Sequence, residues 1–520
     1  MIKGIIFDYD KTLYSHELKF VPNLTLKTLR KLKDKGIRLA LCTSREQFEL
    51  TDLDKDCVAM MDLIVSGNGS TIIQDNKVIE KNIISPVTVK PVIDYLKENN
   101  IAYHYSDTAG KVYFANKFPE GLLEDFYHDN LSEFVFKDYQ DEELLNILVY
   151  FPEEKQLEEI NKLTGELSAT PLFCGPQLAK KGIDKGFGTR LFMEKFNLDK
   201  AETIAVGDAL ADIKMFKEAA VSISTIDAKK EVQEASTYIM RKSIEEGGLY
   251  EALIDLKVIE RDEYDIKAFF LDVDNTIYDH SIKNVRPSTL EALRQLKQKG
   301  YKLFINSGRS YDESKSIPQE VIALLDGMIL ANGSNYILNG VHHYKPINLA
   351  DSKPLTDFFQ KNDFFFRYVT DENRTYYSKF IPRLERMHVY YQMVLPIKAY
   401  EGEQLIQFLF YSTDESLEEE ISRLAQSLQR TKIKTANEMA RKGVTKATPM
   451  LKVAKLLNLK PENICAFGDS NNDTEMLQAA RLSVAMGNGC LLCKKAATYI
   501  CPDIREEGFA KALRHFGFID

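Results

Sequence analysis

Two short segments of this 520-residue sequence each place a pair of aspartates one residue apart, followed by a threonine. The pairs are Asp8 with Asp10 and Asp272 with Asp274, and each follows an apolar run. Residues i and i+2 of an extended segment point to the same side, so the two carboxylates of a pair can share one site. One carboxylate could then attack while the other moves a proton. Alone, either segment is equally typical of a turn that caps the next helix.

Further acids and a lysine follow in each half. The acids belong to two Gly-Asp-x-x-x-Asp segments and are Asp208, Asp212, Asp469 and Asp473. So many carboxylates in one place are costly unless a cation neutralises them, and oxygen ligands without His or Cys favour Mg²⁺. Lys185 and Lys446 each stand 23 residues before the first aspartate of a segment. This repeated spacing favours a fixed positive charge at the site over a solvated residue at a helix start.

A third pair of segments adds hydroxyl groups after an apolar run, at 43–45 and 307–309. The candidate phosphate-binding residues there are Thr43, Ser44, Ser307 and Gly308, which offer hydroxyls and backbone N–H groups. A strand-to-helix turn explains either segment equally well in isolation. Acids, cation, lysine and hydroxyl together describe phosphoryl transfer, in which a protein positions the reactants and neutralises charge.

The chain repeats one unit, because all these motifs recur at a nearly constant distance. Asp8 to Asp272 and Thr43 to Ser307 are each 264 positions apart, whereas the lysines and the Gly-Asp segments are each 261 apart. One three-residue change in register, between residues 68 and 185, indicates a shared scaffold with a variable middle. We expect two tandem domains joined in the charged stretch 257–265.

The elements that position the motifs are short apolar runs alternating with amphipathic helices. This alternation predicts an α/β fold in which a parallel sheet is covered by helices on both faces. Ligands of such sheets bind beyond the carboxyl ends of the strands. The first motif aspartate of each segment follows an apolar run, at 4–7, 203–207, 268–271 and 463–468. We therefore expect two strand-end clusters, one in each half.

Composition narrows the class of protein. A formal net charge of −9 argues against a partner such as nucleic acid or an anionic membrane. No apolar run approaches the ~18–20 residues needed to cross a bilayer, and the first residues lack a signal-peptide pattern. Seven scattered cysteines, including one Cys490-x-x-Cys493, favour ordinary reduced thiols over disulfides or a zinc site. We expect a soluble cytoplasmic protein without an obligate protein partner.

The order of the motifs resembles the haloacid dehalogenase-like phosphatase superfamily. The Asn-Gly segments at 68–69 and 332–333, and the long insert before each lysine, are similar to its Cof-type, subclass IIB branch. The resemblance covers nearly the whole chain, once per half, and implies two Rossmann-like cores, each with an inserted α/β cap. The implied cores are 1–83 with 181–258 and 259–346 with 442–520, and the implied caps are 84–180 and 347–441.

The resemblance also implies roles. Asp8 and Asp272 would be nucleophiles that form an aspartyl-phosphate, and Asp10 and Asp274 would be the acid/bases. The implied Mg²⁺ ligands, counting the backbone carbonyl of each acid/base, are Asp8, Asp10, Asp208, Asp272, Asp274 and Asp469. Asp212 and Asp473 would lie behind these ligands and orient the catalytic lysines.

The two halves match the family unequally. Asn472 is implied to contact phosphate, whereas the first half has Ala211 at that position. The second half continues with a Gly-Asn loop at 485–489, and the first half has no such loop at 223–227. We expect an Mg²⁺-dependent phosphatase of small phosphorylated metabolites, such as sugar or cofactor phosphates, whose second site is the more complete. The alternatives are a sugar phosphomutase with the same chemistry, or a first half that is a non-catalytic metabolite-sensing or structural module.

Overall fold

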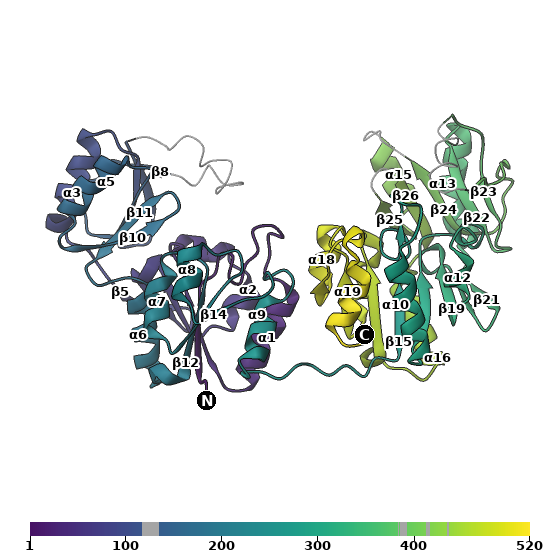
Figure 1. The fold of residues 1–520 in the computed structure, drawn as a ribbon. Coiled ribbons are helices and arrows are strands. Elements are labelled where there is room, and N and C mark those ends of the chain that lie inside the picture. Colours follow the sequence, from purple (N-terminus) through teal and green to yellow (C-terminus); the bar gives the residue numbers. More distant parts are fainter. Residues whose placement is uncertain (117–134, 383, 385–392, 412–416, 434–435) are drawn as a thin grey trace. The chain divides into compact units, whose positions relative to one another are not determined.

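The computed structural model describes residues 1–116, 135–382, 384, 393–411, 417–433 and 436–520. The chain divides into two compact units, Met1–Arg261 and Asp262–Asp520, whose boundary lies in the charged stretch 257–265. Each unit contains one large sheet and a second, separate sheet (Figure 1).

The large sheet of the first unit has eight strands, of which six neighbouring ones run parallel. In sheet order the strands are β14 (Tyr238–Ile239), β13 (Val221–Ser224), β12 (Thr203–Gly207), β1 (Gly4–Phe7), β2 (Arg38–Cys42), β3 (Leu63–Ser66), β4 (Thr71–Gln74) and β5 (Lys77–Lys81). Every residue of β1 and β12 is buried, which requires cover on both faces and explains their continuous apolar sequences. The expected α/β fold with a Rossmann-like core is confirmed.

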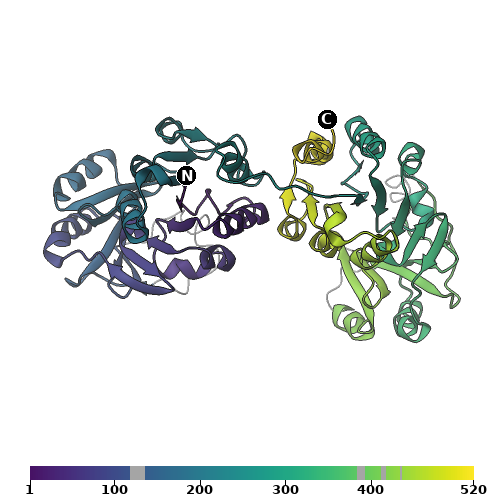
Figure 2. The same cartoon turned by 90° about the horizontal axis from the view of Figure 1, so that it is seen from below.

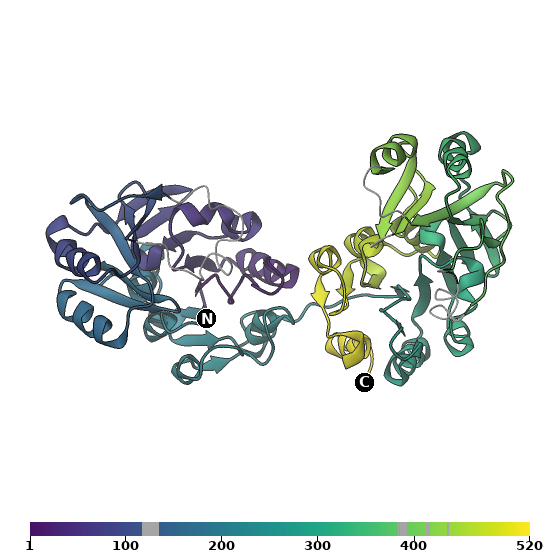
Figure 3. The same ribbon diagram turned by 90° about the horizontal axis from the view of Figure 1, so that it is seen from above.

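Helices supply that cover. One face packs against α6 (Lys185–Phe196), α7 (Asp212–Glu218) and α8 (Lys230–Ala235), which contribute Phe192, Met215 and Val232 to a cluster with Ile6 of β1. On the other side lie α1 (Asn23–Asp34) and α9 (Gly248–Asp255), with α2 (Lys55–Ala59) beside them (Figure 1). Figure 2 and Figure 3 show the same layers from below and from above.

The second sheet of this unit is inserted between β5 and α6 and is largely antiparallel. Its strands, in sheet order, are β10 (Leu167–Leu172), β11 (Gly175–Lys180), β9 (Leu144–Val149), β6 (Tyr103–Asp107), β7 (Val112–Ala115) and β8 (Val135–Phe136). The helices α3 (Pro86–Glu98) and α5 (Glu154–Leu163) bury Val92, Leu96 and Ile160 against it. We call this inserted layer the cap.

The second unit repeats this plan. Its core strands, in sheet order, are β21 (Val341–Tyr344), β20 (Asn335–Leu338), β19 (Gly327–Leu330), β18 (Lys302–Asn306), β15 (Ala268–Leu271), β27 (Ile464–Gly468), β28 (Leu482–Ala485) and β29 (Tyr499–Ile500). Its core helices are α10 (Pro287–Gln298), α11 (Tyr311–Ser314), α12 (Gln319–Ile322), α16 (Ala447–Leu456), α17 (Thr474–Ala479), α18 (Leu491–Ala496) and α19 (Gly508–His515). A small hairpin pairs β16 (Tyr278–Asp279) with β17 (Asn284–Val285).

The cap of the second unit is again an antiparallel sheet with helices on one face. Its strands, in sheet order, are β23 (Thr375–Tyr377), β22 (Phe366–Thr370), β24 (Leu405–Tyr411), β26 (Ala436–Arg441) and β25 (Leu428–Ile433), and its helices are α13 (Leu349–Lys361) and α15 (Glu418–Leu424). Phe359 of α13 packs its ring against Phe366 and Phe410 of this sheet. Among the described residues, no helix is long and apolar enough to cross a membrane.

We expect residues 1–261 and 262–520, produced separately, each to unfold in one cooperative transition. Each unit holds a complete core sheet with its own buried clusters, and none of the described strands pairs across the boundary. Urea unfolding followed by circular dichroism should give each fragment the midpoint that it has in the full chain. A fragment 1–180, which lacks β12 to β14, is the control, and its core sheet should not fold. Failure of either complete unit to fold alone would contradict the prediction.

Candidate functional site

The motif residues lie where adjacent parallel strands end. In the first unit Asp208, Asp8 and Thr43 directly follow β12, β1 and β2, which are neighbours in the sheet. The corresponding residues after β27, β15 and β18 of the second unit are Asp469, Asp272 and Ser307. The carboxyl ends of parallel strands meet at one edge. Each unit therefore gathers one cluster at this edge.

A buried lysine joins two aspartates in the first cluster. Lys185 is the first residue of α6, which begins there because the Asp184 side chain accepts a hydrogen bond from the backbone N–H of Phe187 at 2.9 Å. Lys185 Nζ donates to Asp8 Oδ1 and to Asp212 Oδ1, both at 2.6 Å. Burial alone would lower the pKa of Lys185, but the charges of Asp212 and Asp8 hold it above its ordinary value. The lysine is a permanent positive charge between two carboxylates.

The second cluster has the same bridge. Lys446 Nζ donates to Asp272 Oδ1 and Asp473 Oδ1, again both at 2.6 Å. The three side chains are at most 6% exposed, so this ion triplet is shielded from solvent. Breaking such a buried arrangement by removing one partner is strongly destabilising.

The last aspartate of each Gly-Asp-x-x-x-Asp segment uses both carboxylate oxygens within the protein. While Asp212 Oδ1 binds the lysine, its Oδ2 accepts the backbone N–H groups of Asp208 at 2.9 Å and Ala209 at 2.8 Å. Asp473 Oδ2 makes the same two bonds, each at 3.0 Å. A Cβ on Gly207 would lie 2.4–2.6 Å from atoms of the Asp212 side chain, so the motif glycine is what lets this carboxylate approach.

Burial and crowding raise the pKa of the remaining carboxyls. Burial, followed by the charge of Asp212, raises the pKa of Asp208 to about 6, and burial also raises the pKa of Asp8 well above its ordinary value. In the second unit burial and the neighbouring aspartates raise the pKa of Asp272 to about 7 and that of Asp469 to about 9. One lysine does not neutralise three carboxylates, so each cluster favours a further cation.

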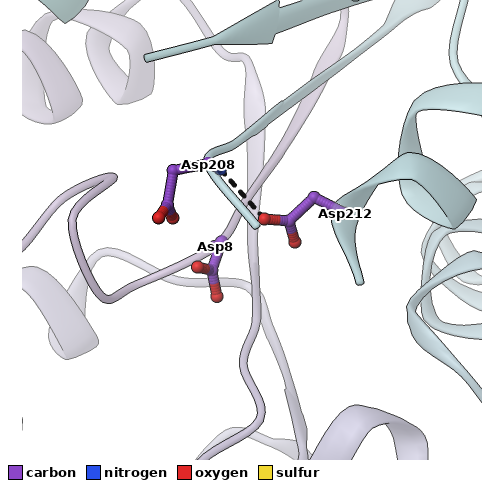
Figure 4. Close-up of side chains that lie close together, drawn as sticks. All are labelled: Asp8, Asp208 and Asp212. Atoms are coloured by element: carbon purple, nitrogen blue, oxygen red, sulfur yellow. Dashed lines mark hydrogen bonds between the residues drawn. The ribbon is translucent and has the colours of Figure 1, made fainter. Parts of the chain in front are cut away.

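The donor sets fit a hard divalent cation. Oxygens of Asp8, Asp208 and Asp212 all lie within 4.8 Å of one another (Figure 4), and Asp272, Asp469 and Asp473 form the equivalent group. Carboxylate oxygens without His or Cys suit Mg²⁺ better than zinc. Because Asp212 and Asp473 already bind protein donors through both oxygens, the two remaining carboxylates of each group are the ones best placed to hold the ion.

The second aspartate of each Asp-x-Asp pair is not part of these groups and is held in a different way. Arg45 donates two hydrogen bonds to Asp10, from Nε to Oδ2 at 2.8 Å and from Nη2 to Oδ1 at 2.6 Å. His16 Nε2 lies 2.9 Å from the same Oδ1. Burial raises the pKa of Asp10, but the hydrogen bonds from Arg45 and His16 outweigh it and bring the pKa below its usual range.

Asp274 is held in the same way. Arg309 donates to it from Nε at 3.0 Å and from Nη2 at 2.6 Å, and His280 Nε2 lies 2.6 Å from its Oδ1. We call each Arg–Asp–His set a clamp. Sequence reasoning assigned no role to these arginines and histidines. The signal was present, because His16 to His280 and Arg45 to Arg309 are each 264 positions apart, in register with the aspartates.

The residue after Asp10 or Asp274 has the same backbone conformation in the two units. These residues, Lys11 and Asn275, both adopt a positive φ, 57° and 58°. Asn tolerates this left-handed conformation, whereas Lys is strained there. The same backbone turn is therefore present in both units, with a non-glycine residue at its left-handed position.

The predicted phosphate-binding residues lie beside the clusters. Thr43 and Ser307 are buried, and their hydroxyl oxygens accept the backbone N–H groups of Arg45 and Arg309, each at 3.1 Å. Ser44 and Gly308 are the next residues of these turns. Asn472 donates to Asn332 Oδ1 at 2.8 Å, a contact that Ala211 cannot make in the first unit.

Cap residues meet the core beside each cluster. Gln177 of β11 donates to Glu46 Oε1 at 2.7 Å and accepts from Asn68 Nδ2 at 2.5 Å. At the matching position 261 residues later, Glu438 of β26 accepts from Asn332 Nδ2. Sequence reasoning named no cap residue, because nothing local distinguishes a cap side chain that faces the core.

Both units match the model of one protein family. The family model of haloacid dehalogenase-like hydrolases matches residues 5–253 and 269–513. YcsE, a 5-amino-6-(5-phospho-D-ribitylamino)uracil phosphatase of Bacillus subtilis (strain 168), is 28% identical over 263 residues, which are 50% of this chain and 98% of YcsE. The putative phosphatase YkrA of the same strain is 28% identical over 265 residues, 49% of this chain and 99% of YkrA. The solved structure of BT1666, a phosphatase from Bacteroides thetaiotaomicron, is 28% identical, covers 50% of this chain and 98% of its own, and gives a TM-score of 0.44.

Lys446→Met is expected to lower the free energy of unfolding of the metal-free protein by about 3–5 kcal/mol at pH 8, because it leaves buried carboxylates without their counter-charge. The loss should be smaller at pH 5. The pKa of Asp272 in the folded protein, about 7, lies above its ordinary 3.8, so its buried carboxyl favours folding when protonated and loses this contribution as pH rises between these values. Without the lysine, the pKa of Asp272 in the folded protein rises further, so the pH range over which stability falls extends to higher pH.

Urea unfolding in the presence of a chelator, at both pH values, measures this effect. Lys455→Met removes an exposed lysine of the same helix α16 and should change stability by no more than about 0.5 kcal/mol. A loss independent of pH, or an equal loss in the control, would contradict the prediction.

Proposed function

Since the chain belongs to the haloacid dehalogenase-like hydrolase family, we propose that each unit hydrolyses phosphate monoesters of small metabolites through an aspartyl-phosphate. The observation that carries this proposal is the pair of buried Lys–Asp bridges, which recur with identical distances in the two units. A charge-neutralised carboxylate at the end of a central strand is suited to attack a phosphoryl group, because the mixed anhydride it forms is itself readily hydrolysed.

Asp8 and Asp272 are the proposed nucleophiles. One oxygen of each is held by the lysine at 2.6 Å, which fixes the carboxylate. Attack on phosphorus forms the carboxyl–phosphate bond as the bond to the leaving alcohol breaks. Lys185 and Lys446 then offset charge that develops near the carboxylate during the transfer.

Asp10 and Asp274 are the proposed acid/bases. The clamps hold these carboxylates ionised in the free protein, the form that takes a proton from water when the aspartyl-phosphate is hydrolysed. Protonation of the leaving alcohol in the first step requires the neutral form, which the approach of a phosphate anion favours because like charges raise a carboxyl pKa. The arginine fixes the orientation of the aspartate throughout.

Mg²⁺ is the proposed cofactor, held by Asp8 and Asp208 in the first unit and by Asp272 and Asp469 in the second, with the backbone carbonyl of Asp10 or Asp274. Bound there, it supplies positive charge that neutralises phosphoryl oxygens. Asp212 and Asp473 keep the lysines and the backbone of the metal-binding loops in place through the bonds described above.

The two sites are proposed to differ in substrate. The second has Asn472 beside the cluster and an ionisable cap residue, Glu438, whose pKa burial raises to about 7, whereas the first has Ala211 and the neutral Gln177. YcsE is named for a phosphate ester on a ribityl chain, and we propose sugar or cofactor phosphates of comparable size for this protein. In this proposal the cap residues recognise the leaving group, and the strand-end residues bind the phosphate.

Replacing both nucleophiles, Asp8→Asn with Asp272→Asn, is expected to lower phosphate release by about 10³-fold or more, because an amide cannot form the acyl phosphate. Each single variant should keep the turnover of the other site. The measurement is phosphate release from a panel of phosphomonoesters in Mg²⁺, with chelator as the metal-free control.

The same panel separates the alternatives. Unchanged release in the double variant would refute the mechanism. Activity that needs a sugar bisphosphate and releases little phosphate would favour a phosphomutase. If Asp272→Asn alone abolished all turnover, the first unit would be a non-catalytic module.

Binding of Mg²⁺ to metal-free protein at pH 7.5 is expected to release about one proton from the second site. The pKa of Asp469, about 9, keeps this carboxyl protonated at that pH, whereas Asp208, at about 6, is already ionised. Calorimetry in two buffers of different ionisation enthalpy counts the protons. Asp469→Asn should remove the release and Asp208→Asn should leave it; equal effects of the two changes would show that the assignment is wrong.

A further inference from the structure

The Cys-x-x-Cys segment lies beside the second strand-end cluster and has no part in the proposed hydrolysis. Cys490 precedes α18 and is partly exposed, whereas Cys493 is fully buried. The other five cysteines of the chain are free and buried. A thiol-reactive molecule in solution would therefore meet Cys490 first.

The two thiols are close enough to react with each other. Cys490 Sγ accepts the backbone N–H of Cys493 at 3.4 Å. Cα atoms three residues apart at a helical turn are about 5 Å apart. This separation lies within the range of about 4.4–6.8 Å that a disulfide spans.

Cys490 is also attached to the loop that carries Asp469. Its backbone N–H donates to the carbonyl oxygen of Asp469 at 2.7 Å, and its Sγ donates to Asn471 Oδ1 at 2.9 Å. A Cβ on the preceding Gly489 would lie 2.9 Å from that same Asp469 oxygen, so the two loops are in close contact. A change in the bonding of the Cys490 sulfur can therefore shift the Asp469–Asp473 segment.

The first unit lacks this feature. At the corresponding positions, 261 residues earlier, it has Lys229 and Val232. The dithiol is present in one copy of a duplicated site, and the other copy is an internal control.

We propose that Cys490 and Cys493 form a redox-active dithiol that reacts with small disulfides of the glutathione class and controls the second site alone. The thiolate of Cys490 attacks one sulfur of the small disulfide, which forms a mixed disulfide and releases one thiolate. Cys493 then loses its proton and attacks Cys490 Sγ, which expels the second thiolate. Two protein thiols are oxidised and one small disulfide is reduced to two thiols.

Closing the protein disulfide removes the S–H donor to Asn471 and draws the Cys490 side chain toward Cys493. The hydrogen bonds that hold the Asp469 carbonyl and the turn beginning at Ser470 are thereby weakened. We expect the oxidised second site to bind its cation and turn over substrate less well, and the first site to be unaffected.

The thiol chemistry is tested on the full native chain with oxidised glutathione as the probe and intact-mass spectrometry as the readout. The wild type should lose two thiols without retaining an adduct, Cys493→Ala should retain one glutathione per chain, and Cys490→Ser should not react. An unreactive wild type, or a mixed disulfide that persists in it as in Cys493→Ala, would overturn the proposal. These outcomes do not depend on phosphatase activity.

The control of the second site is tested with phosphate release in two backgrounds, an arm that rests on the proposed function. Oxidation should lower turnover by about fivefold or more in Asp8→Asn, where only the second site acts, and leave Asp272→Asn unchanged. A reducing agent should restore the loss, and Cys490→Ser in the Asp8→Asn background should be insensitive. If oxidation proceeds but both backgrounds respond equally, or neither responds, the proposed control is wrong. If neither background turns over substrate, calorimetric Mg²⁺ binding to Asp8→Asn and to Asp272→Asn, compared before and after oxidation, decides the same question.

Discussion

A buried lysine between two aspartates is the interaction on which each half of this protein depends. Three carboxylates converge where the central strands end, and the low-dielectric interior makes this convergence unfavourable without a counter-charge. Lys185 and Lys446 provide the first positive charge, and their positions at the start of α6 and α16 follow from how the chain returns from the cap to the core. The single lysine leaves negative charge in excess, which is the physical basis for a divalent cation at the same place.

The proposed acid/base aspartates, Asp10 and Asp274, lie in a contrasting environment, although they are only two residues from the proposed nucleophiles. Asp8 and Asp272 are almost fully buried, whereas the side chains of Asp10 and Asp274 are 29% and 32% exposed. The arginine clamps lower the pKa of one carboxylate, while burial raises that of its neighbour. Two chemically identical side chains thereby differ in pKa, as the proposed roles of nucleophile and acid/base require.

Duplication has preserved the charged centre and allowed its surroundings to diverge. The lysine bridges, the clamps and the motif glycines match between the units to within a few tenths of an ångström in their hydrogen bonds. The cap contacts and the loop after the last core aspartate differ. This division follows from the energetics, because an unpaired buried charge is far more costly than a changed contact at the edge of the site.

The family, the duplication, the α/β fold and the identity of the aspartates, lysines and hydroxyls were predictable from the sequence, because strand and helix periodicity and repeated motif spacing are properties of the linear chain. Even the clamp histidines, His16 and His280, carried a readable signal in their spacing. The tertiary structure alone decided which oxygen of Asp212 binds Lys185 and which binds backbone N–H groups. It also decided that Gln177 reaches Asn68 across 109 residues and that Cys490 lies against Asp469. Partners of this kind depend on distance and direction in the folded chain, which composition and spacing do not encode.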